Sequence, residues 1–198
     1  MASSSKNLLL LAALVLFVAA SLTSPPVVHA SPGGGGGGTS TKRTHIRVYV
    51  HERFSGPNAT VATVAPSPLG NDSSTFGMVG ALDDELRASP DADYSPIIGR
   101  FRGVFVGTDL VDDEEYFSSV TVVFTAGGDH RGSALSLQGQ YRFPAGEQED
   151  DVVERAVVGG TGRFRRATGY SLLKVVSSTT EAAVFQLDLF VFTPRAGY

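Results

Sequence analysis

Turn-forming residues interrupt this chain at short, regular intervals, and the segments between them alternate apolar and polar side chains. In His45–Glu52, Ile46, Val48 and Val50 share one face of a strand. Ser55 to Asn58 then has the composition of a tight turn. Further segments bounded by Gly, Asp, Ser or Pro follow: Thr60–Val64, Ser73–Leu82, Ile97–Val106, Tyr116–Phe124, Ser133–Phe143, Val152–Val158, Gly169–Val176 and Val184–Phe192.

These eight or nine candidate strands come without any sustained helical periodicity, so they predict an all-β domain, either an antiparallel barrel or a sandwich. Only the short segment Asp83–Ala88 is compatible with one helical turn. A hydrophobic content of 42% is sufficient for a single core. A barrel of about eight strands would enclose an interior able to hold one small ligand.

The first 30 residues have the features of a secretory signal peptide. Lys6 precedes an apolar stretch from Leu8 to Ala20, and Ala30 is the small residue expected before a cleavage site. The apolar stretch is shorter than the ~20 residues that a spanning helix needs. We therefore expect residues 1–30 to be removed, leaving an extracellular protein without a membrane anchor.

Residues 31–43 form a Gly-rich leader that includes the run Gly33 to Gly38. Such a composition cannot bury enough apolar surface to order itself, so the leader is expected to be flexible. The folded domain is then expected to span residues 44–198. Asn58 and Asn71 begin Asn-x-Ser/Thr sequons and are candidate glycosylation sites in a secreted chain.

The charge and the composition argue against several classes of function. The net charge is −4, and phosphate backbones require a concentrated basic surface, so nucleic acid is not an expected partner. The chain has no cysteine, its histidines lack paired spacing, and its acidic runs at 112–115 and 147–151 lack the alternation of a calcium loop. Neither a metal nor a cofactor is therefore expected.

Four ordered groups of motifs cover the chain from about Thr44 to Thr193. They are Val48-Tyr49-Val50-His51-Glu52 with Gly56-Pro57-Asn58-Ala59-Thr60; Phe76-Gly77, Asp83-Asp84-Glu85-Leu86 and Gly99-Arg100-x-x-Gly103; Phe124-Thr125, Gly132-Ser133-x-Leu135 and Gly139; and Val157-Val158-Gly159-Gly160-Thr161-Gly162-x-Phe164-x-x-Ala167-x-Gly169-Tyr170. Taken together and in this order, they resemble the plant dirigent family.

The resemblance implies an eight-stranded antiparallel β-barrel of the allene-oxide-cyclase and dirigent type, commonly a homotrimer in the apoplast or cell wall. Members bind phenoxy radicals or quinone methides derived from phenolic small molecules and direct stereoselective phenylpropanoid coupling, as in lignan biosynthesis. A separate oxidase, a laccase or a peroxidase, supplies the radicals. The resemblance therefore implies no intrinsic oxidative activity and no cofactor.

Glu52 is the candidate acid or base, because it aligns with the aspartate of the family's His-Asp pair. It keeps the carboxylate and moves it by about 1.5 Å. In an apolar cavity its pKa is expected to be raised. Three further positions are candidate substrate-binding residues: Phe105 where coupling members often have Tyr, Arg163 where they often have Asp, and Thr168 where many members have Arg. These departures indicate a substrate other than that of the best-known coupling to pinoresinol.

Two alternatives to directed coupling remain open. The first is a cofactor-free enzyme, a quinone-methide cyclase or isomerase, which would act without an oxidase. Allene oxide cyclases share a similar barrel, but they act in plastids, and this leader lacks the Arg-rich composition of a transit peptide. The second is a non-catalytic binding protein of the wall or of plant defence.

Overall fold

The computed structural model describes residues 41–69, 74–111, 115–126, 128–142 and 152–195. The predicted signal peptide, residues 31–40 of the leader, and Asn71 lie outside this part of the chain. Asn58 lies exposed in the turn between the first two strands, and its glycosylation stays a prediction. The strands are β1 (Thr41–Arg53), β2 (Val61–Ala65), β3 (Val79–Arg87), β4 (Ile97–Gly107), β5 (Glu115–Phe124), β6 (Ala134–Arg142), β7 (Val153–Thr161), β8 (Thr168–Ser178) and β9 (Ala182–Pro194).

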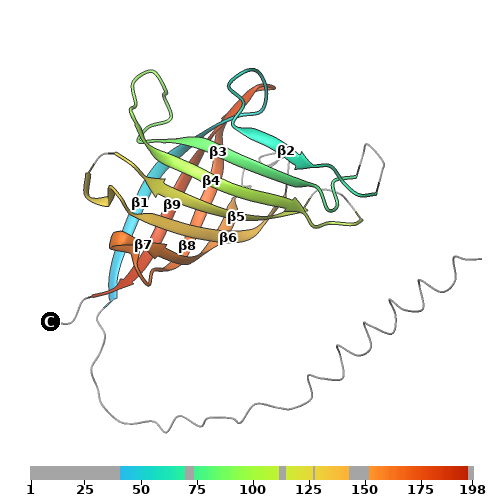
Figure 1. Cartoon of the computed structure of the whole chain (residues 1–198). Coiled ribbons are helices and arrows are strands. Elements are labelled where there is room, and N and C mark those ends of the chain that lie inside the picture. The colour runs from blue at the N-terminus through green and yellow to red at the C-terminus, as the bar shows by residue number, and fades with distance from the viewer. Residues whose placement is uncertain (1–40, 70–73, 112–114, 127, 143–151, 196–198) are drawn as a thin grey trace, which may run out of the picture. The chain divides into compact units, whose positions relative to one another are not determined.

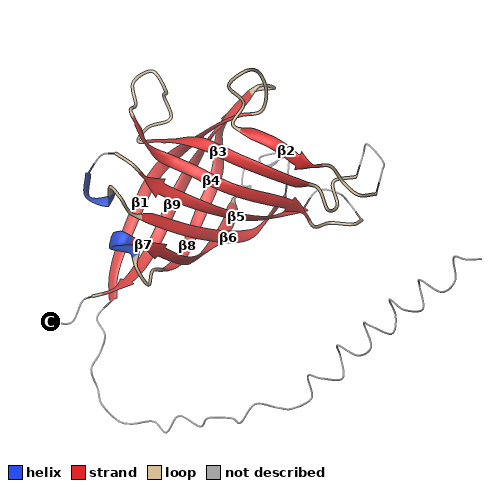
Figure 2. Cartoon of the chain, in the orientation of Figure 1, coloured by secondary structure: helices blue, strands red, loops and turns tan. Residues whose placement is uncertain are grey.

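Strands dominate the described chain, and two short 3-10 turns accompany them, η1 (Gly128–His130) and η2 (Gly162–Phe164) (Figure 2). β1 begins at Thr41, so it includes three residues that the sequence assigned to the leader. These residues pair with Phe192 to Pro194 at the end of β9, which is the last described strand. The two ends of the folded domain therefore lie side by side (Figure 1).

The strands form one closed ring. Their order is β1-β9-β8-β7-β6-β5-β4-β3-β2, and a further pairing of β1 with β3 completes the circle. β1 pairs with the second half of β3, whereas β2 pairs with its first half. Eight strands thus close the ring and β2 extends it, which confirms the predicted eight-stranded antiparallel barrel.

Side chains alternate between the barrel interior and its outer surface. On β5, the buried set consists of Tyr116, Ser118, Val120, Val122 and Phe124, while the residues between them are partly or fully exposed. The apolar core is dense where β5 ends and β6 begins, because Phe124, Leu135 and Phe164 meet there. Towards the other end, where β5 begins, the interior is not filled.

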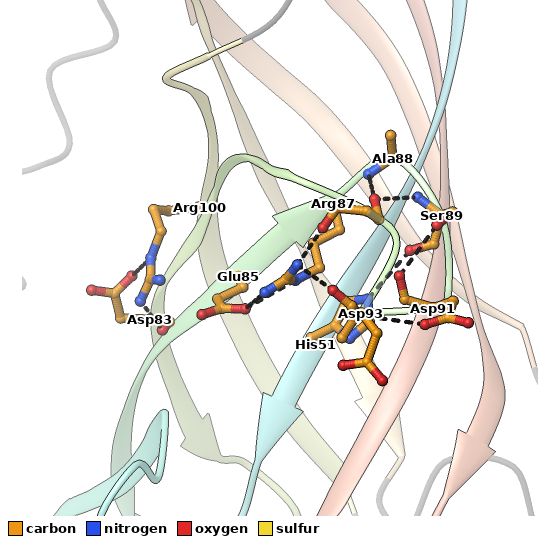
Figure 3. Close-up of polar contacts among 11 residues, drawn as sticks. His51, Asp83, Glu85, Arg87, Ala88, Ser89, Asp91, Asp93 and Arg100 are labelled. Atoms are coloured by element: carbon orange, nitrogen blue, oxygen red, sulfur yellow. Dashed lines mark hydrogen bonds and ion pairs between the residues drawn. The ribbon is translucent and has the colours of Figure 1, made fainter.

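The single helical turn that the sequence allowed at Asp83–Ala88 does not form, because Asp83 to Arg87 continue β3 and pair with β4, with a register shift between Leu86 and Arg87. The acidic composition of this segment has a different cause. Its charged side chains on the outer face form ion pairs: Asp83 accepts hydrogen bonds from Arg100 at 2.7 Å and Arg102 at 2.8 Å. Glu85 accepts one from Arg87 at 2.7 Å (Figure 3). Pairing of this segment with β4 therefore outweighs its local preference for a helical turn.

The connection from β3 to β4 is held by side-chain to backbone hydrogen bonds. The buried Ser95 hydroxyl accepts hydrogen bonds from the N–H groups of Ala88 and Ser89, both at 3.0 Å (Figure 3). Arg87 donates to the carbonyl oxygens of Ala92, at 2.8 Å, and Ser95. These side-chain hydrogen bonds thus satisfy backbone groups that have no strand partner after β3 ends.

Substituting Gly169 with alanine should destabilise the barrel. Gly169 has φ +137°, and a Cβ there would lie 2.0 Å from the carbonyl oxygen of Phe190 on β9. We expect Gly169→Ala to lower the free energy of unfolding by at least about 1–3 kcal/mol in urea denaturation. Gly159→Ala is the matched control, because a Cβ there meets no atom within 4 Å. Equal losses of unfolding free energy in the two variants would show that the close approach of Gly169 to Phe190 is not what requires glycine there.

Candidate functional site

The unfilled end of the barrel contains a cavity of about 330 Å³. This volume lies near the lower limit of the roughly 300–1,000 Å³ typical of small-molecule sites, which favours one ligand molecule. Most of its wall is apolar. The lining residues are Val50, Glu52, Phe54, Val61, Ala62, Thr63, Met78, Leu82, Phe101, Phe105, Tyr116, Tyr141, Val153, Arg155, Leu173 and Phe185.

Three aromatic rings form one side of the cavity. Phe105 meets Tyr116 edge to face, with ring centroids 6.0 Å apart, and Tyr116 stacks on Tyr141 with centroids 5.4 Å apart. The Phe105 ring occupies the space beside Gly80 on β3, where a Cβ would lie 2.0 Å from it. These rings offer planar apolar faces against which another aromatic ring can pack.

Glu52 reaches the cavity from the inward face of β1, in line with Val48 and Val50. Burial raises the pKa of its carboxyl to about 7, and the nearby charge of Arg155 acts in the opposite direction. A carboxyl with this pKa changes its protonation near neutral pH, as a general acid or base should. The expectation of a raised pKa at Glu52 therefore agrees with the geometry.

Asp84, on the inward face of β3, is fully buried and does not line the cavity. Its Oδ1 accepts a hydrogen bond from the Thr60 hydroxyl at 2.5 Å. Its Oδ2 is buried with no hydrogen-bond partner in the described structure. Burial, followed by the charge of Glu52, raises the pKa of Asp84 to about 8. Asp84 is therefore a neutral acid behind Glu52 at neutral pH.

Thr60 links Asp84 to the start of the turn after β1. Its hydroxyl oxygen accepts a hydrogen bond from the N–H of Arg53 at 2.9 Å while its proton goes to Asp84. The Gly-Pro-Asn-x-Thr motif and the Asp-Asp-Glu-Leu motif thus meet in space. Their contact fixes the end of β1 that carries Glu52.

Arg155 supplies a buried positive charge from β7. Its Nε donates to the Ser118 hydroxyl at 2.7 Å, and its Cζ lies 5.0 Å from the centroid of the Tyr141 ring. Its Nη1 is buried without a hydrogen-bond partner in the described structure. Burial lowers the pKa of Arg155, yet a guanidinium keeps its proton in proteins. Burial also raises the pKa of Tyr141, so its phenol stays neutral.

The structure brings together two of the four residues that the sequence singled out. Glu52 and Phe105 line the cavity. Thr168 is exposed at the start of β8 and pairs with Phe192, and Arg163 is exposed in η2, so neither belongs to this cavity. Side chains alternate between the two faces of β8, and Ser171 and Leu173 are on its inward face. Thr168 is on the other face and therefore points away from the interior.

Sequence reasoning missed Asp84, Arg155, Tyr116 and Tyr141 as site residues. For the two charged residues, Asp84 and Arg155, the sequence itself contains a pattern that could have identified them. Asp84 lies between Leu82 and Leu86 on the apolar face of its strand, and Arg155 lies between Val153 and Val157 in the same way. A charge on an otherwise apolar face of a strand points inward, where it needs a partner or a function.

Among the residues that the structure describes, no group of three or more His, Asp and Glu side chains is arranged to hold a metal ion. No helix among these residues is long and apolar enough to cross a membrane.

Comparison with known proteins places this barrel in a family. Residues 43–192 match the family model described as dirigent-like protein. Pterocarpan synthase 1 of Glycyrrhiza echinata is 34% identical over 154 residues, covering 76% of this chain and 78% of that protein. Dirigent protein 21 of Arabidopsis thaliana is 32% identical, covering 76% and 77%. The chain therefore belongs to the dirigent family.

A solved structure supports the same relationship. The pterocarpan synthase dirigent protein GePTS1 aligns with a TM-score of 0.68 at 30% sequence identity, covering 80% of this chain and 88% of that one. The family assignment made from the four motif groups is thereby confirmed. As a dirigent-family barrel, the chain has a cavity suited to phenolic ligands, which agrees with the aromatic wall described above.

The buried acid Asp84 should make the protein less stable as the pH rises. The unfolded chain loses this proton near the ordinary pKa of aspartate, whereas the folded chain keeps it to about pH 8. The free energy of unfolding therefore falls between pH 5 and pH 8. Asp84→Asn removes this contribution and keeps an acceptor for Thr60, so it should be more stable than the wild type at pH 8 by at least about 1 kcal/mol.

Urea denaturation at pH 5 and pH 8 checks this prediction, with Asp83→Asn as the control. Although burial acts to raise the pKa of Asp83, hydrogen bonds from Arg100 and Arg102 hold it below its usual range. Asp83→Asn should therefore leave the loss of stability between pH 5 and pH 8 unchanged. A wild type with equal stability at both pH values would show that Asp84 is not a buried neutral acid.

Proposed function

We propose that this protein is a secreted, cofactor-free dirigent-type cyclase that closes a ring on a quinone methide. The observation that carries the proposal is the pairing of one titratable carboxyl, Glu52, with one buried cation, Arg155, across a cavity that is otherwise mainly apolar. Coupling of two radicals needs neither a base nor a cation. Addition of a hydroxyl to a quinone methide uses both.

The reaction begins with the carbonyl oxygen of the quinone methide near Arg155. The free N–H of Nη1 can donate a hydrogen bond to this oxygen, which gains negative charge as the ring becomes aromatic. Ionised Glu52 accepts the proton of a hydroxyl group in the same molecule. The hydroxyl oxygen forms a bond to the methide carbon, and the electron pair of the exocyclic double bond moves to the carbonyl oxygen.

The proton then passes from Glu52 to the new phenolate, so the step is a net isomerisation that needs no oxidant. Asp84 stays protonated behind Glu52, where a second ionised carboxylate would be unfavourable. The packed rings of Phe105, Tyr116 and Tyr141 hold the substrate with one face towards the nucleophile, which fixes the hand of the product. The relatives named pterocarpan synthase support a ring-closing activity.

Stereoselective coupling of phenoxy radicals from phenylpropanoids, supplied by a laccase or a peroxidase, is the second candidate. The aromatic wall favours it, because stacked rings can present one face of a planar radical. Secretion to the apoplast and assembly into a homotrimer are further parts of the proposal. They derive from the N-terminal sequence and from the family resemblance.

Glu52→Gln should lower kcat for cyclisation of a preformed quinone methide by about 10²–10⁴-fold, since it removes the base and keeps the shape of the side chain. Glu52→Asp, with the residue usual in the family, should recover part of the rate. The wild-type rate should rise between about pH 6 and pH 7.5, because the ionised form is the base and its pKa is about 7. Chiral chromatography after short incubations separates enzymatic product from racemic background. A Glu52→Gln variant with the wild-type rate would exclude this mechanism.

Adding an oxidase should not be necessary for product formation. We expect the protein to give an enantiomeric excess from a quinone methide that carries its own nucleophile, and a racemic product from monolignols oxidised by laccase. Enantiomeric excess only in the laccase reaction would instead establish directed coupling. Racemic products in both reactions would exclude both activities and leave a non-catalytic binding role as the remaining candidate function.

A further inference from the structure

We propose that the end of the barrel remote from the cavity binds an acidic polysaccharide through a cationic basin. The basin has a volume of about 440 Å³. It lies where β1 begins and β9 ends, next to the two helical turns (Figure 2). Its lining residues are Lys42, Thr44, Asp129, His130, Arg163, Phe164, Thr193, Pro194 and Arg195.

The charge of the basin is opposite to that of the whole chain. Three cations, Lys42, Arg163 and Arg195, line it with one acid, Asp129, while the chain carries a net charge of −4. The segments that meet here (41–44, 125–133, 161–168 and 192–195) contain Asp129 as their single acidic residue and seven lysines or arginines in all. This local excess produces a positive potential at one end of an acidic protein.

The three lining cations are available for a ligand. Lys42, Arg163 and Arg195 are exposed, and none forms an ion pair with another residue in the described ranges. In contrast, Arg47, Arg87, Arg100 and Arg102 are all paired with carboxylates on the barrel wall. The unpaired cations are thus not needed to hold the strands together.

The basin has a rigid aromatic floor. The rings of His130 and Phe164 lie 5.1 Å apart between their centroids, and Phe164 is buried. The N–H of Arg163 donates to the Ser133 hydroxyl at 3.1 Å, which anchors η2 to the start of β6. Thr44 and Thr193 add hydroxyl groups to the wall. The cations therefore project from fixed backbone positions around a floor that is already packed.

Arg166 adds a further cation next to η2, at the same end of the barrel. It has φ +63° and is the one non-glycine residue with positive φ in the described structure. Glycine adopts this conformation more readily than a residue with a side chain, so the backbone at Arg166 is strained.

An extended polyanion fits the basin better than a small anion. The three cations come from separate elements, β1, η2 and the residue after β9, and all three line the same basin. Many weak contacts to charges repeated along a chain suit this arrangement. Nucleic acid is disfavoured because the Phe164 ring is buried and offers no exposed stacking platform. The choice of an acidic glycan also rests on the proposed secretion.

The test uses the full-length chain expressed through a secretory host and de-esterified polygalacturonate as the probe. Its methyl-esterified form has the same backbone without the charges and is the matched ligand control. We expect calorimetric binding to the de-esterified polymer at low salt, none to the esterified polymer, and loss of binding at high salt.

Arg163→Gln combined with Arg195→Gln should weaken this binding by about tenfold. Arg53→Gln combined with Lys174→Gln makes the same change in net charge at exposed sites outside the basin and should stay within about twofold of the wild type. Arg163→Lys combined with Arg195→Lys keeps the charge and should retain binding. The cyclisation rate should be unchanged in the two double variants of Arg163 and Arg195, which separates this inference from the proposed function.

Three results would overturn the proposal. One is an equal loss of polygalacturonate binding in the basin variant and in the control variant, since it would show a general effect of net charge. A second is competition by inorganic phosphate or monomeric galacturonate as strong as that by the polymer, which would indicate a small-anion site. The third is tighter binding of an RNA oligonucleotide than of polygalacturonate at the same ionic strength.

Discussion

The short pairing between β1 and β3 is the contact on which the rest of this structure depends. Three residue pairs, Tyr49 to His51 with Glu85 to Arg87, close the ring. Without them the nine strands would form an open sheet with no interior. The same pairing places the end of β1, which carries Glu52, beside β3, while the adjacent pairing of β2 with β3 brings Thr60 to Asp84.

Closure also explains why charged groups can persist inside. A carboxyl in a closed barrel is removed from water, which favours its neutral form, and Asp84 meets this constraint by staying protonated. Arg155 cannot become neutral and therefore uses the Ser118 hydroxyl and the face of Tyr141. Each of these groups keeps one polar atom unsatisfied. Arg155 lines the cavity, so its Nη1 can donate to a polar group of a ligand, whereas Asp84 lies behind the cavity wall and is stabilised there by its proton.

The strands and their approximate number could be predicted, because strand periodicity and turn residues are local properties. Closure into a barrel rather than a sandwich was implied only by the resemblance to the dirigent family. Glu52 and Phe105 were identified because each belongs to a recognisable motif. The contact of Thr60 with Asp84 could not be found in this way, since it joins residues 24 positions apart and depends on the register in which β2 pairs with β3. Arg163 lies in η2 and Thr168 begins the strand that follows it, and a motif does not reveal at which end of a barrel its loop will lie. Segment 83–88 was compatible with a helical turn because the partners of its charges on β4 are not visible in the local sequence.

The position of β2 has a consequence for how a ligand reaches the interior. Val61, Ala62 and Thr63 of β2 form part of the cavity wall, yet β2 is paired along one edge only, with β3. Its register with β3 also shifts between Thr63 and Ala65. Separating β2 from β3 breaks one short ladder and leaves the other eight strands in a closed ring. A ligand path at β2 would therefore leave the pairs that close the ring intact.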